Sequence, residues 1–374
     1  MPHFVVISVG YVTFGYAAVP SLVSRRYGVT LVSVGLLMSA ILLAFGCSQV
    51  LIGRVLDDVG TVGPLLVGTP VHALLAVALD LTGTFPELLA LRFLWGLVGG
   101  GLLAVGAAHI ARLYEGRAAT RAQGIYGGML TVGGTIAFVL VPRLTAYTAW
   151  FGVHAVGGVL AIPALLVLVP HAAGGDDVDP GPSGTSSAAG WDFSALLRSS
   201  TIPLTAVCYV AALSSYITLS TFVTAYFRDL GVFVSLNAVV LGLASLGRIA
   251  GGLGVARWTV DDARITAVGT GVGCVGFLAL AVAESPLLVA LLPMVSMVAA
   301  SAPFGAIYNL AAGADAGEGI GLGVVLAAGN FSALVFPAVT GAVREATGSY
   351  GVAFGLLATL NAIAVVAALR LRGR

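Results

Sequence analysis

The stretch Ser48–Gly60, SQVLIGRVLDDVG, separates two long apolar runs of the sequence. It combines glycines, one arginine and two adjacent aspartates in a chain that is 59% hydrophobic and only 9% charged. Soluble domains carry about 25% charged residues. So little charge cannot cover a water-soluble fold of 374 residues. The composition therefore favours an integral membrane protein, in which this stretch is a break between two spans.

Apolar runs long enough to cross a bilayer recur along the whole chain. A span needs about 20 such residues, and the sequence predicts an all-α membrane protein with about twelve transmembrane helices. They lie near residues 4–22, 31–52, 63–82, 87–111, 122–142, 149–169, 201–226, 234–255, 264–283, 286–311, 320–342 and 350–370.

One long polar segment, 171–199, holds aspartates and prolines among glycine and serine and shows no apolar period. This composition is typical of a flexible linker. The segment predicts a division into an N-terminal six-helix bundle, 1–170, and a C-terminal six-helix bundle, 200–374.

The placement of arginine predicts the orientation, because loops on the cytoplasmic side carry an excess of basic residues. With both termini inside, the arginines of the inner loops and tail outnumber those of the outer loops two to one. We expect a multi-pass protein of the cytoplasmic membrane with a cytoplasmic linker. The first apolar run has no basic stretch before it and no cleavage site, so we expect a span there and no signal peptide.

Several function classes are disfavoured. A net charge of +1 does not imply a nucleic-acid partner. Cys47, Cys208 and Cys274 are far apart in apolar runs, which disfavours a disulfide or metal cluster. A membrane enzyme would need acids, histidines or cysteines gathered at one depth, and the sequence shows no such group. We expect a monomer without cofactor or metal, whose partners are a small solute and the lipid bilayer.

The two halves of the chain look related. Setting Gly53 against Gly252 aligns SQVLIGRVLDD (48–58) with GRIAGGLGVAR (247–257), and both segments close an apolar span at its cytoplasmic end. Two similar six-span halves with a cytoplasmic linker are what a carrier working by alternating access requires.

The pattern Gly53-x-x-x-Asp57-x-x-Gly60 resembles the signature loop between the second and third helices of the major facilitator superfamily of secondary transporters. The glycines allow a tight turn, and the aspartate can face positive helix N-termini. In that family the loop is a cytoplasmic gate latch, so the resemblance implies gating roles for Gly53, Asp57 and Gly60.

This copy of the loop departs from the family pattern. Asp58 stands where a basic residue usually follows the aspartate, and Thr61-Val62 replaces a basic pair. The latch would then use Arg54 or the arginines of the loop between the fourth and fifth spans. A solvated turn without a gating role is the alternative. The loop arginines are Arg112, Arg117 and Arg121.

The resemblance covers nearly the whole chain. LRFLWGLVGGG (91–101) is similar to the fourth-helix motif of the family, with Arg92 in the place of its arginine. RAQGIYGG (121–128) resembles the start of the fifth helix, and the segment 329–355 resembles the last two helices.

Arg248 is the strongest candidate for substrate binding. Burying an ionisable group in the hydrocarbon of the bilayer costs free energy, so such a residue is first interpreted as part of a functional site. Its counterpart in the aligned halves is Gln49. A forked, permanently charged donor opposite an amide suits a small anion, a carboxylate above all. The alternatives are that Arg248 extends to the cytoplasmic surface or pairs with Asp261 or Asp262.

Other polar residues inside spans are weaker candidates for substrate contact. The seventh span, CYVAALSSYITLSTF (208–222), carries more hydroxyl groups than lipid-facing packing needs. Hydrogen bonding that only packs helices together is the alternative for each of these residues. The candidates are Tyr126, Tyr216, Asn309 and Asn330.

Arg92 and Asp80 are candidates for proton coupling or gating. An ion pair of Arg92 with Asp80 or Glu87 is the alternative. His109 and His154 could titrate, but hydrogen-bonded helix packing is the expected role of both.

The sequence thus predicts a secondary transporter of a small solute, in first place an organic or inorganic anion, with protons as a candidate coupling ion. A proton-coupled drug or metabolite exporter of the same superfamily is the alternative. The exporter signature of the fifth helix has a Gly-Pro pair that GGMLTVGGTIAFVLVPRL (127–144) lacks. A sensor on the same fold without transport is a further alternative. Gly271-x-Gly273-x-x-Gly276 has dinucleotide-binding spacing but is expected to be helix packing, since no strand precedes it.

Overall fold

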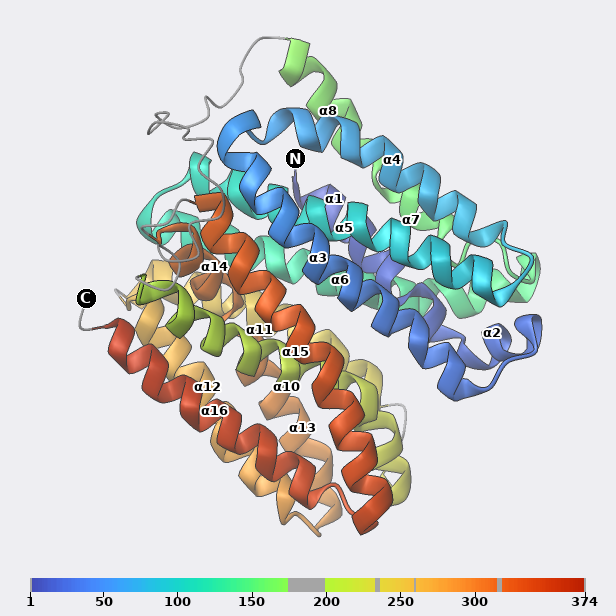
Figure 1. The fold of residues 1–374 in the computed structure, drawn as a ribbon. Helices are drawn as coiled ribbons and strands as arrows, with labels where there is room; N and C mark the ends of the chain where they lie inside the picture. Colours follow the sequence, from blue (N-terminus) through green and yellow to red (C-terminus); the bar gives the residue numbers. More distant parts are fainter. Residues whose placement is uncertain (1, 174–198, 233–235, 259, 315–317, 373–374) are drawn as a thin grey trace. The chain divides into compact units, whose positions relative to one another are not determined.

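The computed structural model describes residues 2–173, 199–232, 236–258, 260–314 and 318–372, and the regular structure in these ranges is helical throughout (Figure 1). The first half contains α1 (Pro2–Phe14), η1 (Gly15–Ala18), α2 (Pro20–Tyr27), α3 (Leu31–Val59), α4 (Val62–Asp80), α5 (Phe85–Leu113), α6 (Gly116–Thr148), α7 (Ala155–Leu160) and α8 (Ile162–Ala173). The second half contains α10 (Thr201–Asp229), α11 (Leu236–Trp258), α12 (Asp262–Ala281), α13 (Pro286–Ser301), α14 (Phe304–Ala312), α15 (Glu318–Thr347) and α16 (Gly351–Leu371).

The lengths and compositions of these helices are those of a multi-pass membrane protein. Within the described ranges, nine helices are long and apolar enough to cross a bilayer. The pair Pro2–Ala18 and Pro20–Tyr27, bent by 70°, makes a tenth span if it is counted as one. Two shorter apolar helices, Ala155–Val167 and Val239–Gly252, lie where the sixth and eighth spans were predicted. Every predicted span therefore corresponds to a helix or to a broken helix pair.

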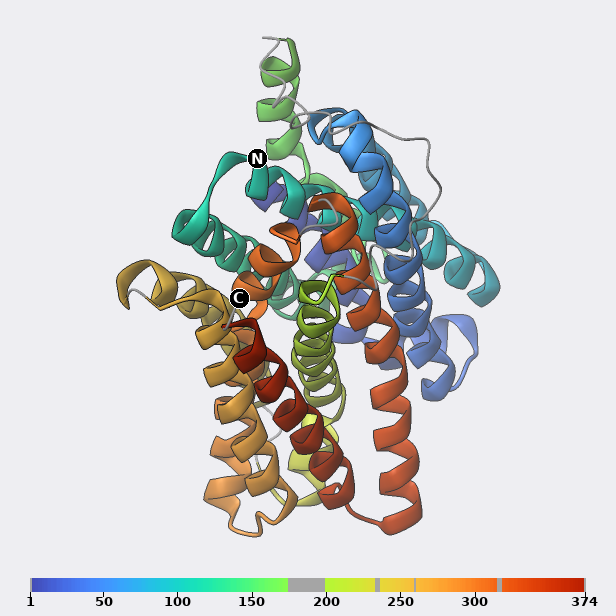
Figure 2. The same cartoon turned by 60° about the vertical axis from the view of Figure 1, so that its left-hand side comes forward.

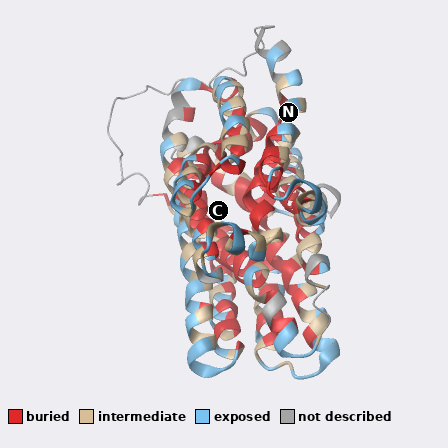
Figure 3. Ribbon diagram, turned by 90° about the vertical axis from the view of Figure 1, so that its right-hand side faces the viewer, coloured by how far each residue is buried: buried red, intermediate tan, exposed pale blue. Residues whose placement is uncertain are grey.

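Apolar side chains on the outer faces of the helices are exposed in stripes. On α12, Val268, Val272, Val275 and Leu278 expose 59%, 43%, 68% and 53% of their surface. Their spacing of three or four residues places them on one face of the helix. Figure 3 shows such exposed positions next to buried ones along the helices. A surface of this kind is a liability in water, but lipid would cover it in a bilayer.

The chain forms two compact units. Unit 1 is Met1–Leu113 with Met129–Gly190, and unit 2 is Tyr114–Gly128 with Trp191–Arg374. In unit 1, α3 and α4 pack on α5. In unit 2, α12 lies beside α13 and α16, and α10 packs on α15 and α16 (Figures 1 and 2).

Helix α6 is divided between the two units. Its residues up to Gly128 belong to unit 2, and those from Met129 belong to unit 1. The predicted bundles 1–170 and 200–374 place the whole of α6 with the N-terminal half, and this division remains a prediction. Most of the predicted linker, 171–199, lies outside the described residues.

The apolar part of α3 that could cross a bilayer, Ser33–Ile52, matches the predicted span, but the helix itself is longer. Helix α3 continues to Val59 and does not end at residue 52. The turn is at Gly60, whose φ of 74° is favourable only for glycine. Charged residues at a membrane surface are compatible with a helix, so the glycine ends α3 and the arginine and aspartates do not. Gly53 and Asp57 are consequently helical, and their side-chain surroundings lie outside the described part of the structure.

Candidate functional site

Arg248 lies in the apolar helix α11 and is fully buried, with 0% of its surface exposed. It is among the largest completely buried side chains of the described residues. The expectation that it could extend to the surface is therefore wrong. The expected pairing with Asp261 or Asp262 is wrong as well, because the carboxylate of Asp261 lies near Arg372 and that of Asp262 accepts from Thr120 and Asn309.

The Arg248 guanidinium is held by one carbonyl and two aromatic rings, all from unit 2. Its Nη1 donates to the carbonyl oxygen of Gly127 on α6 at 3.0 Å. Its Cζ lies 3.7 Å from the ring centroid of Phe304 on α14 and 5.0 Å from that of Tyr216 on α10. These distances are those of cation–π contacts, which stabilise a desolvated cation by about 2 kcal/mol.

Two of the three guanidinium nitrogens of Arg248 have no hydrogen-bond partner among the residues that the structure describes. Nε and Nη2 are both buried and unpartnered. No carboxylate among the described residues forms an ion pair with this guanidinium. Nε and Nη2 share one edge of the planar group, which is the edge that binds two oxygens of a carboxylate in parallel. The buried guanidinium therefore presents one edge with two unused hydrogen-bond donors.

Aromatic and hydroxyl side chains surround this group in unit 2. Tyr209 on α10 packs on Phe304 with ring centroids 5.5 Å apart. Its hydroxyl lies 3.3 Å from the hydroxyl of Tyr308 on α14. Tyr126 on α6 is buried, with 2% of its surface exposed. The structure thus brings the predicted residues Arg248, Tyr126 and Tyr216 into one unit with Tyr209 of the hydroxyl-rich seventh span. It adds Phe304 and Tyr308, which the sequence did not single out. We name Arg248, Gly127, Tyr209, Tyr216, Phe304 and Tyr308 the arginine site.

Glycines allow the helices of the arginine site to approach one another. A Cβ on Gly124 of α6 would lie 2.7 Å from the Cα of Gly252 and 2.9 Å from the carbonyl oxygen of Arg248. A Cβ on Gly305 of α14 would lie 2.5 Å from the backbone nitrogen of Gly124. Only glycine fits such backbone contacts. The segment RAQGIYGG (121–128) thereby brings the Gly127 carbonyl within reach of Arg248.

The other predicted substrate contacts have different surroundings. Asn309 donates from Nδ2 to Asp262 at 2.6 Å and to Thr120 at 3.1 Å. Asn330 donates to the carbonyl of Leu326 in its own helix at 2.9 Å. Gln49 is buried in unit 1, and the arginine site is in unit 2.

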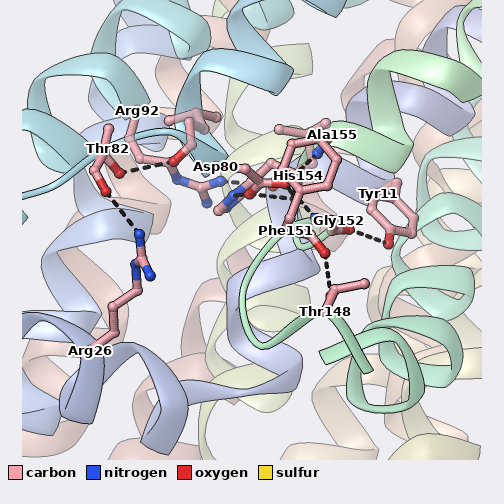
Figure 4. Close-up of polar contacts among 12 residues, drawn as sticks. Tyr11, Arg26, Asp80, Thr82, Arg92, Thr148, Phe151, Gly152, His154 and Ala155 are labelled. Atoms are coloured by element: carbon pink, nitrogen blue, oxygen red, sulfur yellow. Dashed lines mark hydrogen bonds and ion pairs between the residues drawn. The ribbon is translucent and has the colours of Figure 1, made fainter. Parts of the chain in front are cut away.

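Asp80 at the end of α4 organises a loop of unit 1 (Figure 4). Its carboxylate accepts the backbone N–H groups of Gly152, His154 and Ala155 at 2.8 to 3.1 Å. The His154 ring Nδ1 lies 2.8 Å from Oδ1. The Tyr11 hydroxyl donates to the carbonyl of Gly152 at 3.0 Å. These bonds fasten the loop before α7, and nothing in the sequence pattern pointed to them.

Arg92 on α5 is fully buried and closes the end of α1. It donates to the carbonyls of Val12 and Thr13 at 2.7 and 2.9 Å, and its Cζ lies 4.5 Å from the ring centroid of Tyr16. The last carbonyl groups of a helix have no hydrogen-bond donors within that helix. The guanidinium of Arg92 is the donor for two of them, where α1 ends and η1 begins.

The expected ion pair of Arg92 with Asp80 or Glu87 is not found in the described residues. Glu87 instead accepts the backbone N–H groups of Gly83 and Thr84 at 2.9 and 3.1 Å. This arrangement is a capping box at the start of α5.

The turn after α3 has a basic neighbour from the predicted loop. Arg112 donates from Nη2 to the carbonyl of Leu56 at 2.7 Å, close to the end of α3. His109 lies 2.8 Å from the Thr61 hydroxyl, which is a helix-packing contact. Gating by Gly53, Asp57 and Gly60 remains a prediction.

The glycines with dinucleotide-binding spacing pack helices in unit 2. A Cβ on Gly273 would lie 3.0 Å from Asn361 Oδ1, and one on Gly276 would lie 2.5 Å from Ser296 Oγ. Asn361, which the sequence did not single out, donates to the Ser215 hydroxyl at 2.8 Å. No group of three potential metal ligands occurs among the residues that the structure describes.

The fold and its apolar surface define a multi-pass, all-helical membrane protein, and its buried arginine marks a candidate functional site. A sequence profile of the Major Facilitator Superfamily matches residues 4–322. The chain belongs to this superfamily, and membership indicates a transporter, not an enzyme. A search of curated protein sequences gave no match.

Solved structures of the superfamily share the fold. The proton:xylose symporter XylE, bound to 6-bromo-6-deoxy-D-glucose, is 12% identical with a TM-score of 0.75, over 98% of this chain and 93% of that chain. The E. coli fucose:proton symporter FucP is 14% identical with a TM-score of 0.73, over 100% of this chain and 98% of that chain. The human organic anion transporter MFSD10 is 17% identical with a TM-score of 0.74, over 98% of both chains.

Proposed function

We propose that this protein is a secondary active transporter that moves a small anion, in first place a carboxylate, across the cytoplasmic membrane by alternating access. The observation that carries the proposal is the buried guanidinium of Arg248, which has two unpartnered nitrogens and no carboxylate partner in the described residues. Tyr126 and Tyr216 complete the proposed substrate contacts, and Gln49, Asn309 and Asn330 are kept as secondary candidates. Protons are the candidate coupling ion, and both termini are placed in the cytoplasm.

The energy of burial supports an anionic partner. An unpaired charge inside a protein carries a desolvation penalty of several kcal/mol. The carbonyl of Gly127 satisfies one nitrogen, and the ring of Phe304 offsets part of the remainder. A carboxylate would supply the missing countercharge and both missing acceptors at once.

The shape of the free edge supports a planar ligand. Gly127 occupies Nη1 and Phe304 lies against the guanidinium, so a ligand meets the group through Nε and Nη2. Carboxylate and nitrate place two oxygens in a plane that matches this edge. A single guanidinium favours a ligand with one negative charge.

A buried positive charge disfavours the exporter of cationic drugs, because like charges repel strongly at close range. Neutral sugars and organic anions are both transported by proteins with this fold, as the symporters and the anion transporter above show. At such low identity the likeness concerns the fold alone. The arginine site is therefore what separates the candidates.

Thermal unfolding of the purified protein with a panel of solutes tests the proposal. The panel holds nitrate, acetate, benzoate, xylose and a cationic dye. A ligand at about 100 times its Kd stabilises the folded state by about 2.7 kcal/mol. We expect stabilisation by benzoate or acetate in the wild type and its loss in Arg248→Gln. The matched control is Arg143→Gln, since the exposed Arg143 is in unit 1 and contacts its own helix.

The outcomes separate the candidate functions. Stabilisation by the dye alone, unchanged in Arg248→Gln, would overturn the anion proposal and support an exporter. Stabilisation by xylose with no response to any anion would favour a neutral solute.

A further inference from the structure

We propose that Asp262 is a positioning residue for the arginine site. Together with Thr120 and Asn309 it fastens the first part of α6 to unit 2, so that the Gly127 carbonyl stays in place to orient Arg248. The inference rests on the proposed function, since its consequence is measured as anion affinity. We name Thr120, Asp262 and Asn309 the aspartate cluster.

The aspartate cluster joins three helices through short hydrogen bonds. The Thr120 hydroxyl on α6 donates to Asp262 Oδ1 at 2.6 Å. Asn309 Nδ2 on α14 donates to Asp262 Oδ2 at 2.6 Å and to the Thr120 hydroxyl oxygen at 3.1 Å. Thr120 is completely buried, with 0% of its surface exposed. Each carboxylate oxygen of Asp262 therefore binds a side chain from a different helix.

Neutral donors alone orient the Asp262 carboxylate. No arginine forms an ion pair with it in the described part of the chain. The adjacent Asp261 has other partners. It caps α12 by accepting the N–H of Arg264 at 2.6 Å, and its second carboxylate oxygen lies 3.7 Å from Arg372 Nε. Bonds from neutral donors to a charged acceptor are about twice as strong as bonds between neutral groups. The carboxylate is thus committed to joining α6 and α14 to α12.

The same helices build the aspartate cluster and the arginine site. Helix α6 carries Thr120 in the cluster and Gly127 at the arginine site. These two residues are seven apart, or about two turns, and so lie on one face of α6. Helix α14 carries Asn309 in the cluster and Phe304 against the guanidinium. A displacement at the cluster would therefore reach Arg248 from two sides.

Direct backbone packing connects the two places. Gly124, midway between Thr120 and Gly127 in the sequence, lies against Gly252 and Gly305 without intervening side chains. Gly252 is one turn beyond Arg248 on α11. Such contacts transmit small shifts, because packed interiors deform little. Beyond Gly128 the helix continues into unit 1, so the cluster also decides how firmly this shared helix is held to unit 2.

Thr120→Val tests the inference, because it removes the hydroxyl and keeps the shape. Benzoate is the probe, and its Kd is measured by titration calorimetry. We expect Kd to rise about tenfold, because the Gly127 carbonyl would no longer hold Arg248 in one orientation. Thr120→Ser should restore a Kd near that of the wild type. Thr270→Val is the matched control, since Thr270 is buried on α12 and donates only within its own helix.

Hydrogen exchange provides a measurement that needs no ligand. In Thr120→Val we expect the amides of 114–128 to exchange about tenfold faster, with no such change in Thr270→Val. Unchanged exchange in this segment would overturn the inference, and so would an unchanged Kd in a variant with faster exchange. If the wild type binds none of the panel anions, the proposed function fails, and the exchange data still decide whether the cluster holds α6.

Discussion

Nη1 of Arg248 lies 3.0 Å from the carbonyl oxygen of Gly127, so a backbone group of α6 fixes the orientation of a buried cation on α11. A carbonyl inside a helix already accepts a bond from its own helix, and Arg248 uses its second lone pair. The guanidinium is thereby held against Phe304, and its Nε and Nη2 have no hydrogen-bond partner among the described residues. This fixed orientation leads to the first two predictions.

Arg248→Lys should weaken benzoate binding although it keeps the positive charge. An ammonium is a compact point charge without the planar fork, so it cannot bind two oxygens in parallel or stack on Phe304 in the same way. We expect Kd to rise about tenfold or more, equivalent to about 1.4 kcal/mol. Titration calorimetry on the purified variant measures the change, with Arg143→Lys as the control. A lysine variant that binds like the wild type would show that charge alone suffices.

Phe304→Leu should reduce the affinity for benzoate without disturbing the fold. The variant removes an aromatic face 3.7 Å from the guanidinium carbon, a contact of about 0.5–2 kcal/mol. Because the ring also holds the guanidinium in the orientation that leaves Nε and Nη2 free, we expect Kd to rise, by at most about thirtyfold. Phe277→Leu is the matched control, because Phe277 is equally buried in unit 2 but packs on Phe354. Equal effects of the two variants on Kd would contradict a specific role of Phe304.

The twelve spans were predictable because each is a long apolar run, and the bilayer makes that pattern decisive. The sequence singled out Arg248, since it is the one charge in its span, but left open whether the side chain is buried or extends to the surface. Its neighbours did not follow from the sequence, because Phe304 and Tyr308 look like ordinary apolar or packing residues in a linear sequence. Helix α3 extends beyond the predicted span to Val59, because charged residues at a membrane surface are compatible with a helix and Gly60 ends it.

The aspartate cluster shows a second limit of the sequence. From the sequence, Asp262 was considered only as an alternative partner for Arg248. Its actual partners, Thr120 and Asn309, lie in helices far away in the chain. Only the tertiary fold brings the three residues together. The sequence around a polar residue near a helix end does not indicate which distant residue it will bind.

Asp80→Asn should destabilise unit 1. The carboxylate accepts three backbone N–H groups and lies beside the His154 ring, all of them buried. An amide presents an N–H group where an acceptor is needed, and each unsatisfied buried donor costs about 1–3 kcal/mol. We expect a loss of about 3 kcal/mol in the free energy of unfolding, measured by thermal or denaturant unfolding in detergent.

The control for Asp80 is Asp229→Asn. Asp229 pairs with Arg344, and the side chains of the two are 35% and 39% exposed. Such a pair contributes about 0–1 kcal/mol. If Asp80→Asn is as stable as this control but loses the pH dependence of transport, the residue serves proton coupling and not the architecture of the loop.

Gly124→Ala should disrupt the arginine site, whereas Gly242→Ala should not. A Cβ on Gly124 would lie 2.7 Å from the Cα of Gly252 and 2.9 Å from the Arg248 carbonyl, and neither backbone atom can move away alone. Overpacking of this kind costs about 1–3 kcal/mol. A Cβ on Gly242, also in unit 2, meets no atom within 4 Å, and alanine favours a helix by about 0.5–1 kcal/mol. We therefore expect opposite shifts in Tm, with weaker benzoate binding only in Gly124→Ala. Equal shifts would mean that α6 and α11 are not in direct backbone contact, and the carbonyl of Gly127 would then be too far from Arg248 to orient it.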